Sequence, residues 1–412
     1  MNQKLWGVAL ASFALGVFGA ILIGPVISDV QGFVAASGDG EGGPEVLGNT
    51  QLKAQVARLQ QELAQARDEI SKRQLLRSEP GRSRPARSPQ LEKQLVDCLA
   101  WLKLQDADRF GELTLDELAG LQKLDLSGLA LTAEDLRKLV ALANLNELNL
   151  AGAGITDLEL AALADLRSLQ SLNLANALIT DAGLEHLSKM RGLLELELGN
   201  TEITDVGLAQ LAHLGKLSKI ILDGTKITDA GLLSLAGLPI RKLGLGRTGV
   251  TDTGLATLRG FQLEELSLYR NTNISDVGMR HLDTQAELRK LNLRGVKVTA
   301  KGLACLQNMT SLKELNASLS MTDAGMAHLQ NLTSLRRLGL YSNPNITDVG
   351  VAHLRQLKSL QSLHLQFTKI SDKGLAHLED LPLRFLDVRG TQVTDTGRKD
   401  YRSRHRYCRV LK

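Results

Sequence analysis

Apolar and polar residues alternate along most of the chain in two patterns that follow each other in turn. The first is LxxLxL, as in Leu145, Leu148 and Leu150, and this alternation is typical of a short strand with one buried face. The second, ITDxGLxxL, places apolar residues at helical spacing behind a Thr or Ser. Each pair of patterns therefore predicts one strand followed by one short helix.

The two patterns together form a repeat of nearly constant length. The Thr or Ser residues that open the helical pattern lie 23 to 25 residues apart. They are Thr132, Thr156, Thr180, Thr204, Thr228, Thr251, Ser275, Thr299, Thr322, Thr347, Ser371 and Thr394. A period in this range is typical of a solenoid, here of about twelve units, in which neighbours stack because no unit can bury its apolar face alone.

Helix capping explains the polar residues of the ITDxGL pattern. The Thr or Ser hydroxyl can accept a hydrogen bond from a free backbone amide, and the next Asp places negative charge near the positive end of the helix dipole. From Thr156 onward, the Asp is missing only at Ala300 and the later Gly only at Glu159. A row of metal-binding or catalytic carboxylates is the rival interpretation. Capping accounts for every copy, so we expect neither a metal site nor a catalytic residue here.

Residues 121–397 resemble the leucine-rich repeat family. The phrase LxxLxLxxTxITDxGLxxLxxL is similar to the subtype with a Cys at a buried turn position, which occurs in F-box substrate receptors and in bacterial repeat proteins. Here that position is often Thr, as in Thr201 and Thr225. The resemblance implies an α/β fold, a right-handed curved solenoid with parallel strands on the concave face and short helices outside. It also implies a binding scaffold without a cofactor, and we expect a bacterial, membrane-anchored member.

Residues 1–28 predict a membrane anchor. Residues 5–27 carry no charge over 23 positions, which at helical rise is enough to cross a hydrocarbon core of about 30 Å. Lys4 precedes this segment and acidic residues follow it. The positive-inside tendency therefore places the N-terminus in the cytoplasm and the repeats in the periplasm or at the cell surface. The alternative is a signal peptide that is cleaved near Ala36, which would give a secreted product.

Residues 29–92 predict three connecting segments. Residues 29–50 predict a flexible linker, and residues 77–92, rich in Arg, Ser and Pro, predict a disordered basic spacer. Between them, residues 51–76 carry apolar side chains at alternating steps of four and three. These are Leu52, Val56, Leu59, Leu63, Ala66 and Ile70. Such a seam predicts a coiled-coil-like stalk, and a homodimer through residues 51–76 and a single solvated helix fit it equally well.

Residues 93–120 fit two interpretations. Three acidic residues and a Gly in DADRFGELTLDE fall at positions 1, 3, 6 and 12 of an EF-hand calcium loop. These are Asp106, Asp108, Gly111 and Glu117. Phe110, however, occupies position 5, where an oxygen ligand is expected, and the sequence offers no second loop to pair with this one. The alternative is an N-terminal cap of the solenoid, in which Phe110, Leu113 and Leu115 imitate a strand.

Charge and known motifs narrow the function only in part. The chain has 49 Lys and Arg against 45 Asp and Glu, a net charge of +4, and much of the excess lies in residues 398–412, which predict a basic C-terminal tail. Such a tail could hold nucleic acid, but an extracytoplasmic position argues against that partner. The sequence contains no GxSxG, P-loop or HExxH motif, so we expect no enzyme.

Three classes of function remain. The first is an extracytoplasmic scaffold that binds a protein or polymer on its concave face. The second is a structural envelope tether that uses the stalk and the basic segments. The third is an F-box-like substrate receptor or secreted effector, although no recognisable F-box segment precedes the repeats.

The strand residues that point away from the core predict where a partner binds. Just after each LxL, the first six units carry small residues or Asp, whereas most later units carry large residues. The candidates from this position and its neighbours are Tyr269, Lys290, Arg294, Arg337, Tyr341, His364 and Arg389. Because strands lie about 4.8 Å apart, these side chains would form one basic and aromatic band, which Glu265 and Glu314 interrupt. The opening units instead offer Glu147, Glu195 and Glu197. Tyr and Arg often dominate binding energy, so we expect an acidic or aromatic-accepting protein partner on the later units.

Overall fold

The computed structural model of the chain describes residues 87–319 and 321–412. They fall into two compact units, one that ends at Leu115 and one that spans Asp116–Lys412. The anchor, the linker and the stalk lie outside the described residues, as does the spacer up to residue 86, so these predictions are untested. Across the two described ranges, none of the helices is both long and apolar enough to cross a membrane.

The described part of the first unit is helical. It contains α4 (Pro89–Gln105) and α5 (Ala107–Phe110). Ser88 caps α4 by accepting a hydrogen bond from the Leu91 amide at 3.3 Å, and Pro89 suits the first helical position because its nitrogen has no proton to leave unpaired. The end of the predicted spacer, residues 89–92, is therefore helical rather than disordered.

The EF-hand interpretation of residues 106–117 does not fit this structure. A calcium loop must wrap around the ion, whereas α5 forms a helical turn in its first half. Asp106 caps that turn by accepting a hydrogen bond from the Arg109 amide at 3.0 Å, and it also pairs with the Arg109 guanidinium at 3.0 Å. Within the described residues, no group of three or more His, Cys, Asp or Glu side chains is arranged to hold a metal ion.

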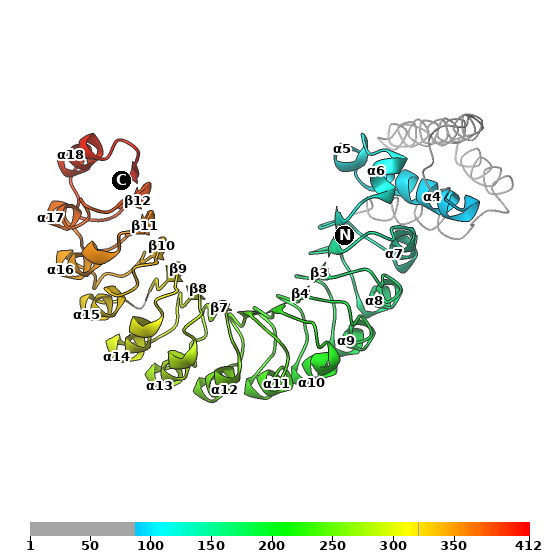
Figure 1. Ribbon diagram of the computed structural model, residues 1–412, viewed down its shortest axis with the longest axis horizontal. Coiled ribbons are helices and arrows are strands. Elements are labelled where there is room, and N and C mark those ends of the chain that lie inside the picture. The colour runs from blue at the N-terminus through cyan, green and yellow to red at the C-terminus, as the bar shows by residue number, and fades with distance from the viewer. Residues whose placement is uncertain (1–86, 320) are drawn as a thin grey trace, which may run out of the picture. The chain divides into compact units, whose positions relative to one another are not determined.

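The described residues of the second unit form one sheet of thirteen parallel strands, each paired with the next along the chain. The strands are β1 (Lys123–Asp125), β2 (Glu147–Asn149), β3 (Ser171–Asn173), β4 (Glu195–Glu197), β5 (Lys219–Ile221), β6 (Lys242–Gly244), β7 (Glu265–Ser267), β8 (Lys290–Asn292), β9 (Glu314–Asn316), β10 (Arg337–Gly339), β11 (Ser362–His364), β12 (Phe385–Asp387) and β13 (Arg409–Leu411). Figure 1 shows them lining the inner side of an arc, which confirms the curved solenoid with a concave parallel sheet.

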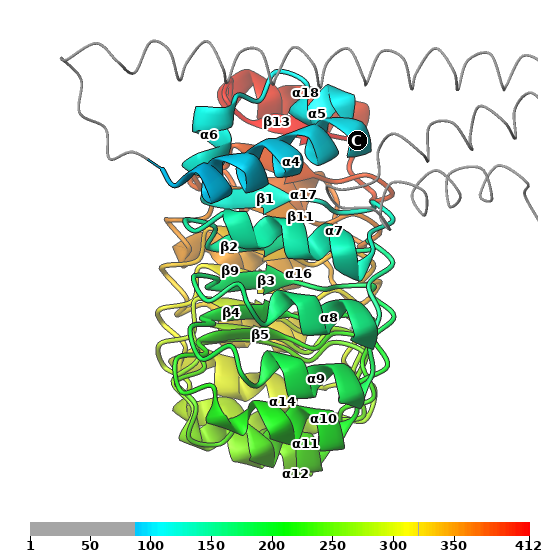
Figure 2. The ribbon, with the colours of Figure 1, turned by 90° about the vertical axis from the view of Figure 1, so that its right-hand side faces the viewer.

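Short helices cover the outer side of the sheet, and the turned view shows the units stacked one on the next (Figures 1 and 2). These α-helices are α7 (Ala133–Lys138), α8 (Asp157–Leu163), α9 (Asp181–Leu187), α10 (Asp205–Gln210), α11 (Asp229–Ser234), α12 (Asp252–Thr257), α13 (Asp276–Met279), α14 (Ala300–Leu303), α15 (Asp323–Met326), α16 (Asp348–Ala352), α17 (Asp372–Ala376) and α18 (Asp395–Arg404), whereas α6 (Leu115–Ala119) precedes β1 along the chain. Several continue as 3-10 helices, which are η1 (Leu139–Ala141), η2 (Leu211–His213), η3 (Leu258–Gly260), η4 (Arg280–Thr284), η5 (Ala304–Asn308), η6 (Ala327–Leu329) and η7 (His353–Gln356).

Leucines of both patterns form a continuous core between the sheet and the helices. Leu145, Leu148 and Leu150 are at most 2% exposed, as their LxxLxL spacing predicts. Burying one such side chain contributes about 2 kcal/mol. Thr201 and Thr225 at the turn position are buried as well, and each hydroxyl donates a hydrogen bond to a backbone carbonyl, as in the bond from Thr201 Oγ1 to the Leu198 carbonyl at 2.7 Å.

The Thr or Ser of each ITDxGL pattern caps its helix as predicted, and the Asp that follows it has a second role. Its carboxylate accepts two hydrogen bonds from the Thr or Ser of the next unit. Asp205 Oδ1 accepts from the Thr228 amide at 2.8 Å, and Asp205 Oδ2 accepts from the Thr228 hydroxyl at 2.5 Å. These bonds, which we call the Asp–Thr ladder, join neighbouring units along the outer side of the solenoid.

Within the described residues, nine junctions carry this ladder. They are Asp157–Thr180, Asp181–Thr204, Asp205–Thr228, Asp229–Thr251, Asp252–Ser275, Asp276–Thr299, Asp323–Thr347, Asp348–Ser371 and Asp372–Thr394. The same carboxylate explains why a Gly stands three residues after the Thr or Ser. A Cβ on Gly207, for example, would collide with the Asp181 carboxylate of the preceding unit. The ladder is interrupted between Ala300 and Thr322, since Ala has no carboxylate.

The predicted basic tail, residues 398–412, is part of the fold. It supplies most of α18 and the last strand, β13, which pairs with β12. Tyr401, Cys408 and Val410 are buried and close the end of the core, although charged residues surround them in the sequence. Lys412 pairs with Asp395 at 3.0 Å. The charge of this segment suggested a tail, but its three apolar side chains determine the structure.

Candidate binding surface on the concave face

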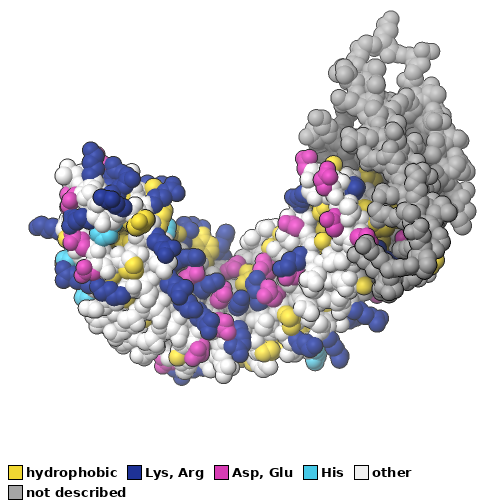
Figure 3. Space-filling model, turned by 45° about the horizontal axis from the view of Figure 1, so that its top comes forward, with side chains coloured by type: hydrophobic (Ala, Val, Ile, Leu, Met, Phe, Trp, Pro, Cys, Tyr) yellow, Lys and Arg dark blue, Asp and Glu magenta, His cyan; other side chains and the backbone are white. Residues whose placement is uncertain are grey.

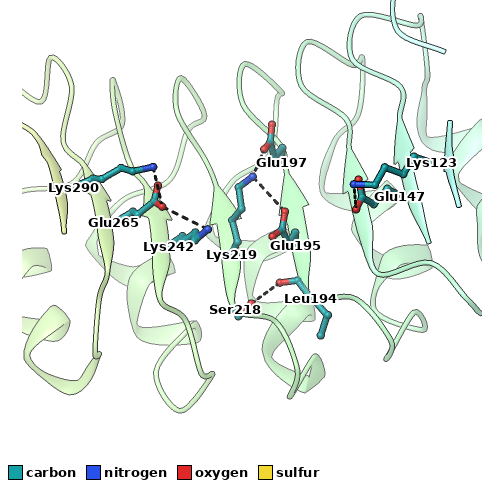
Figure 4. A network of polar contacts seen from close by, with 10 residues as sticks. All are labelled: Lys123, Glu147, Leu194, Glu195, Glu197, Ser218, Lys219, Lys242, Glu265 and Lys290. Carbon is teal, nitrogen blue, oxygen red and sulfur yellow. Dashed lines mark hydrogen bonds and ion pairs between the residues drawn. The ribbon is translucent and has the colours of Figure 1, made fainter. Parts of the chain in front are cut away.

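The strand register aligns the first residue of each strand into one row across the concave face. Lys219 lies opposite Glu195 on one side and Lys242 on the other. Lys219 Nζ contacts Glu197 Oε1 at 2.5 Å and Glu195 Oε2 at 3.4 Å, as Figure 4 shows. Glu147 is paired with Lys123 at 2.7 Å. The opening units are therefore less acidic than their glutamates suggest.

The ion pair of Lys219 also affects its protonation. Burial lowers the pKa of Lys219, but hydrogen bonds and attraction from Glu197 and Glu195 outweigh that effect and raise the pKa above 10.5. Lys219 therefore stays charged at neutral pH and remains bound to both glutamates.

Two predicted site residues, Lys290 and Arg337, belong to similar pairs. Lys290 Nζ lies 3.2 Å from Glu265, which also contacts Lys242 at 3.5 Å (Figure 4). Arg337 Nη1 lies 3.1 Å from Glu314 Oε1. The two glutamates that interrupt the basic band thus compensate these cations. Figure 3 shows the outcome: basic side chains gather over the C-terminal part of the unit, and acidic ones are mixed among them toward its middle.

Four residues at the ends of strands β7 to β10 form a compact group, which we call the tyrosine–arginine cluster: Tyr269, Arg270, Arg294 and Tyr341. The Arg294 guanidinium carbon lies 5.4 Å from the Tyr269 ring centre and 5.0 Å from that of Tyr341. Arg270 lies 5.4 Å from the Tyr269 ring centre. Such cation–π contacts contribute about 0.5–1 kcal/mol each at exposed sites.

The unit between those of Arg294 and Tyr341 carries Ser318 at the corresponding position, and Ser318 is fully buried. A small residue there lets Arg294 reach across one strand to the Tyr341 ring. The ion pairs found among the described residues include neither Arg294 nor Arg270. Arg294 Nε is buried and has no hydrogen-bond partner within the described residues. The cluster therefore presents cations that no carboxylate of the described surface compensates.

A pocket of about 260 Å³ adjoins the cluster. Tyr341, His364, Gln366, Phe367 and Arg389 line it, and most of its wall is apolar. The His364 ring packs against Phe385 with centres 4.9 Å apart. The structure thus brings three predicted residues, Tyr341, His364 and Arg389, into one site, which we call the Tyr341 pocket.

Asp387 holds the pocket wall in place. Its buried carboxylate accepts hydrogen bonds from Arg389 Nε at 2.9 Å, Arg389 Nη2 at 2.7 Å and Gln366 Nε2 at 2.6 Å. Burial raises the pKa of Asp387, but the bonds from Arg389 and Gln366 outweigh it, so the pKa lies below 3.8. Burial also lowers the pKa of His364 below 6.5. At neutral pH the pocket therefore holds a neutral His364 and a compensated Arg389.

Phe367 was not predicted as a site residue. It occupies a left-handed backbone conformation, with φ of 57°, and its side chain is 63% exposed. The corresponding position is Gly in five described units, where φ is also positive. A bulky side chain there is strained by about 1 kcal/mol. A Cβ on Gly390 would meet the Phe367 ring, so this glycine leaves the space in which the ring packs. The other described units carry Gly, Asn, Arg, Leu or Ser at this position, so a single aromatic residue in the row is the sequence signal that could have identified it.

Asp223 is the one charged residue among the small residues of the early units in this row. It packs against Gly244 and Gly246 and accepts a hydrogen bond from the Gly246 amide. Burial raises its pKa above 3.8, and the nearby Glu197 adds to that rise, whereas the bonds from Gly246 and Ser267 oppose it. This carboxylate is bound within the sheet surface and lies apart from the Tyr341 pocket along the strand order.

Comparisons with known proteins agree with a repeat scaffold. A leucine rich repeat family model matches residues 167–227, and a second leucine rich repeat model matches residues 356–378. The fold is similar to that of an internalin from Listeria monocytogenes, with 23% identity over 79% of this chain and 94% of the other, and a TM-score of 0.53. It is also similar to a chain of the yeast Rad7 and Elc1 complex, with 21% identity over 87% and 96% and a TM-score of 0.56. The comparison with curated protein sequences returns no match.

The fold and the concave surface define a solenoid scaffold suited to protein binding. The chain contains leucine-rich repeats, and its second unit has the fold of a leucine-rich repeat solenoid.

Proposed function

We propose that this protein is a non-enzymatic scaffold that holds a partner protein against the concave face of its later units. The observation that carries the proposal is the contrast along one row of the sheet. The early units carry small residues or Asp223 in that row, whereas Tyr269, Arg294, Tyr341 and Arg389 occupy it later and remain at least partly exposed. Leucine-rich repeats generally serve as protein-interaction scaffolds without enzymatic activity, which supports the same class of function.

The proposal includes a location. The charge-free segment of residues 5–27 would anchor the chain in a bilayer, and Lys4 before it would keep the N-terminus in the cytoplasm. The repeats would then meet their partner in the periplasm or at the cell surface, and a stalk of residues 51–76 would allow two copies to associate. Secretion after cleavage near Ala36 is the alternative.

Partner capture tests the binding surface. Cells that carry the full chain would be treated with a cross-linker, and the partners bound by the parent and by a triple variant, Tyr269→Ala with Arg294→Ala and Tyr341→Ala, would be compared. Each hot-spot residue contributes about 1–3 kcal/mol, so we expect the triple variant to lose its specific partners. The matched control is Tyr407→Ala, because Tyr407 is a tyrosine with 96% exposure outside the band.

Two results would contradict this assignment. If the triple variant captures the same partners while Glu195→Ala with Glu197→Ala loses them, the partner lies on the early units. If neither set of changes affects capture but removal of residues 51–76 abolishes function, the protein is a structural envelope tether, which is the second candidate. An F-box-like receptor or effector would bind its partner with the repeats exposed to the cytoplasm.

A further inference from the structure

The Tyr341 pocket suits one uncharged side chain. Its volume of about 260 Å³ lies just below the range of about 300–1,000 Å³ that is typical of whole small-molecule sites. Tyr341, Phe367 and His364 supply three rings to its wall. Asp387 compensates the charge of Arg389 through a two-pronged pair, so a charged group entering the pocket would lose hydration without gaining a counter-ion. An aromatic side chain would instead gain ring contacts and bury apolar area.

The tyrosine–arginine cluster beside the pocket calls for the opposite chemistry. Arg294 and Arg270 both lie against the Tyr269 ring, neither has an ion-pair partner among the described residues, and Arg294 Nε has no hydrogen-bond acceptor there. A carboxylate placed next to Arg294 would compensate its charge. A planar guanidinium binds a carboxylate through two parallel hydrogen bonds, which is the strongest pairing available to it.

Tyr341 connects the two features, because its ring lines the pocket and lies 5.0 Å from the Arg294 guanidinium carbon. In an extended peptide, side chains two positions apart point to the same side and are about 6.6 Å apart. That spacing would place one side chain in the pocket and its neighbour on the same side next to Arg294.

We propose that the Tyr341 pocket and Arg294 together bind an extended acidic and aromatic segment of the partner protein. Its aromatic side chain enters the pocket, and a carboxylate two residues away pairs with Arg294. This inference rests on the proposed function, because it takes the partner to lie on the concave face, and it adds the chemistry by which the partner is recognised.

Synthetic peptides with the full-length chain test the proposal. The probe is the nonapeptide GSDSFSDSG with 4-fluorophenylalanine as its Phe, because an Asp on both sides removes the choice of chain direction. We expect its fluorine NMR line to broaden and shift on addition of the protein. Replacing both Asp by Lys, or the Phe analogue by trifluoromethyl-labelled alanine, should each weaken binding about tenfold or more, which corresponds to about 1.4 kcal/mol.

Protein variants identify the site. Arg294→Glu should reverse the preference, so that the Lys peptide binds more tightly than the Asp peptide. Tyr341→Ala should weaken binding of both, whereas Tyr407→Ala should change neither. Circular dichroism of each variant would establish that it is folded, and Arg294→Lys, which keeps the charge, should retain the preference for the Asp peptide.

Three outcomes would overturn the inference. Equal binding of the peptide without an aromatic ring would make the site a simple anion site, and equal binding of the Lys peptide would make it an apolar pocket without charge selection. Absence of binding by the Asp peptide would also overturn it. In that case the capture experiment decides the broader question, because loss of partners from the triple variant would leave the proposed function standing.

Discussion

Filling the gap in the Asp–Thr ladder should stabilise the solenoid. Ala300 stands where nine other described junctions have an Asp, and Thr322 in the next unit still caps its helix, with its hydroxyl accepting a hydrogen bond from the Gly325 amide at 3.3 Å. Room for the new side chain exists, because Gly325 is retained. A Cβ on Gly183 would meet the Asp157 carboxylate and the Leu160 side chain, whereas a Cβ on Gly325 would meet Met321 and Leu303 and no carboxylate. The substitution Ala300→Asp should therefore place a carboxylate beside Gly325 and form both hydrogen bonds.

The expected gain follows from those two bonds. Hydrogen bonds to a charged group contribute about 1.5–3 kcal/mol each when buried, and partial exposure reduces this value. We expect Ala300→Asp to raise the free energy of unfolding by about 1–2 kcal/mol. The reverse change, Asp229→Ala, removes both bonds to Thr251 and should lower it by about 2–3 kcal/mol.

Urea denaturation followed by circular dichroism measures the overall effect, and hydrogen exchange of residues 299–326 shows whether the gain is local, since repeats interact mainly with their neighbours. The control is Ala230→Asp, which adds the same charge to the first turn of α11 at an exposed position without a ladder partner. The helix dipole alone would give about 0.3–1 kcal/mol. If Ala300→Asp stabilises no more than this control, the ladder does not contribute as argued.

Three further predictions address pH and the terminal segments. Burial raises the pKa of Asp276, but its hydrogen bonds from the next unit outweigh that effect and hold the pKa below 3.8 in the folded state. The stabilisation by Asp276 should be complete above pH 3.8 and be lost at lower pH. The difference in unfolding free energy between the parent and Asp276→Asn should therefore shrink on acidification, and a constant difference would refute this. Protease added outside intact spheroplasts should digest the repeats if residues 5–27 anchor the chain as proposed, and complete protection would show the reverse orientation. If residues 51–76 form a dimeric stalk, the full chain should sediment as a dimer and become monomeric with Leu59→Asp and Leu63→Asp, whereas a monomeric parent would exclude the stalk.

The sequence predicted the fold well because each unit contains most of the information needed for its own core. Leu148 is buried by partners that recur in every unit, so a pattern within one repeat is enough to place it. The tail was misread for the opposite reason. Tyr401 and Val410 belong to no repeat phrase, and only the structure shows that they complete the core behind β12.

The ladder was harder to predict because its two partners lie one unit apart. A signal for it exists at the start of the repeats. The helix before Thr156 begins with Ala133 instead of Asp, and the usual Gly of the Thr156 unit is replaced by Glu159. Glu159 accepts the hydrogen bond from the Thr156 amide at 3.0 Å that an Asp of the preceding unit would otherwise accept. The Gly of the ITDxGL pattern is thus required only where the Asp carboxylate of the preceding unit occupies the space that a side chain would fill.

The candidate site was predicted in outline but not in its charges. Tyr269, Arg294 and Tyr341 could be aligned from the period alone, because the strand register follows it. Whether a cation is compensated depends on which neighbouring side chain reaches it, so the sequence does not distinguish Arg337, which pairs with Glu314, from Arg294, which has no such pair among the described residues. Asp387 was missed because a carboxylate beneath the pocket wall carries no mark in the sequence that distinguishes it from a surface residue.

The ladder is interrupted at a junction that the candidate site spans. Ala300 belongs to the same unit as Arg294, and Thr322 belongs to the next unit, which precedes that of Tyr341. The outer bonds are therefore missing at a junction that the inner cation–π contact crosses. A ligand carboxylate bound to Arg294 and an aromatic group in the Tyr341 pocket would connect the two sides of this junction from the concave face. Binding should then reduce hydrogen exchange there more in the parent than in Ala300→Asp, because the variant already joins these units through its outer side.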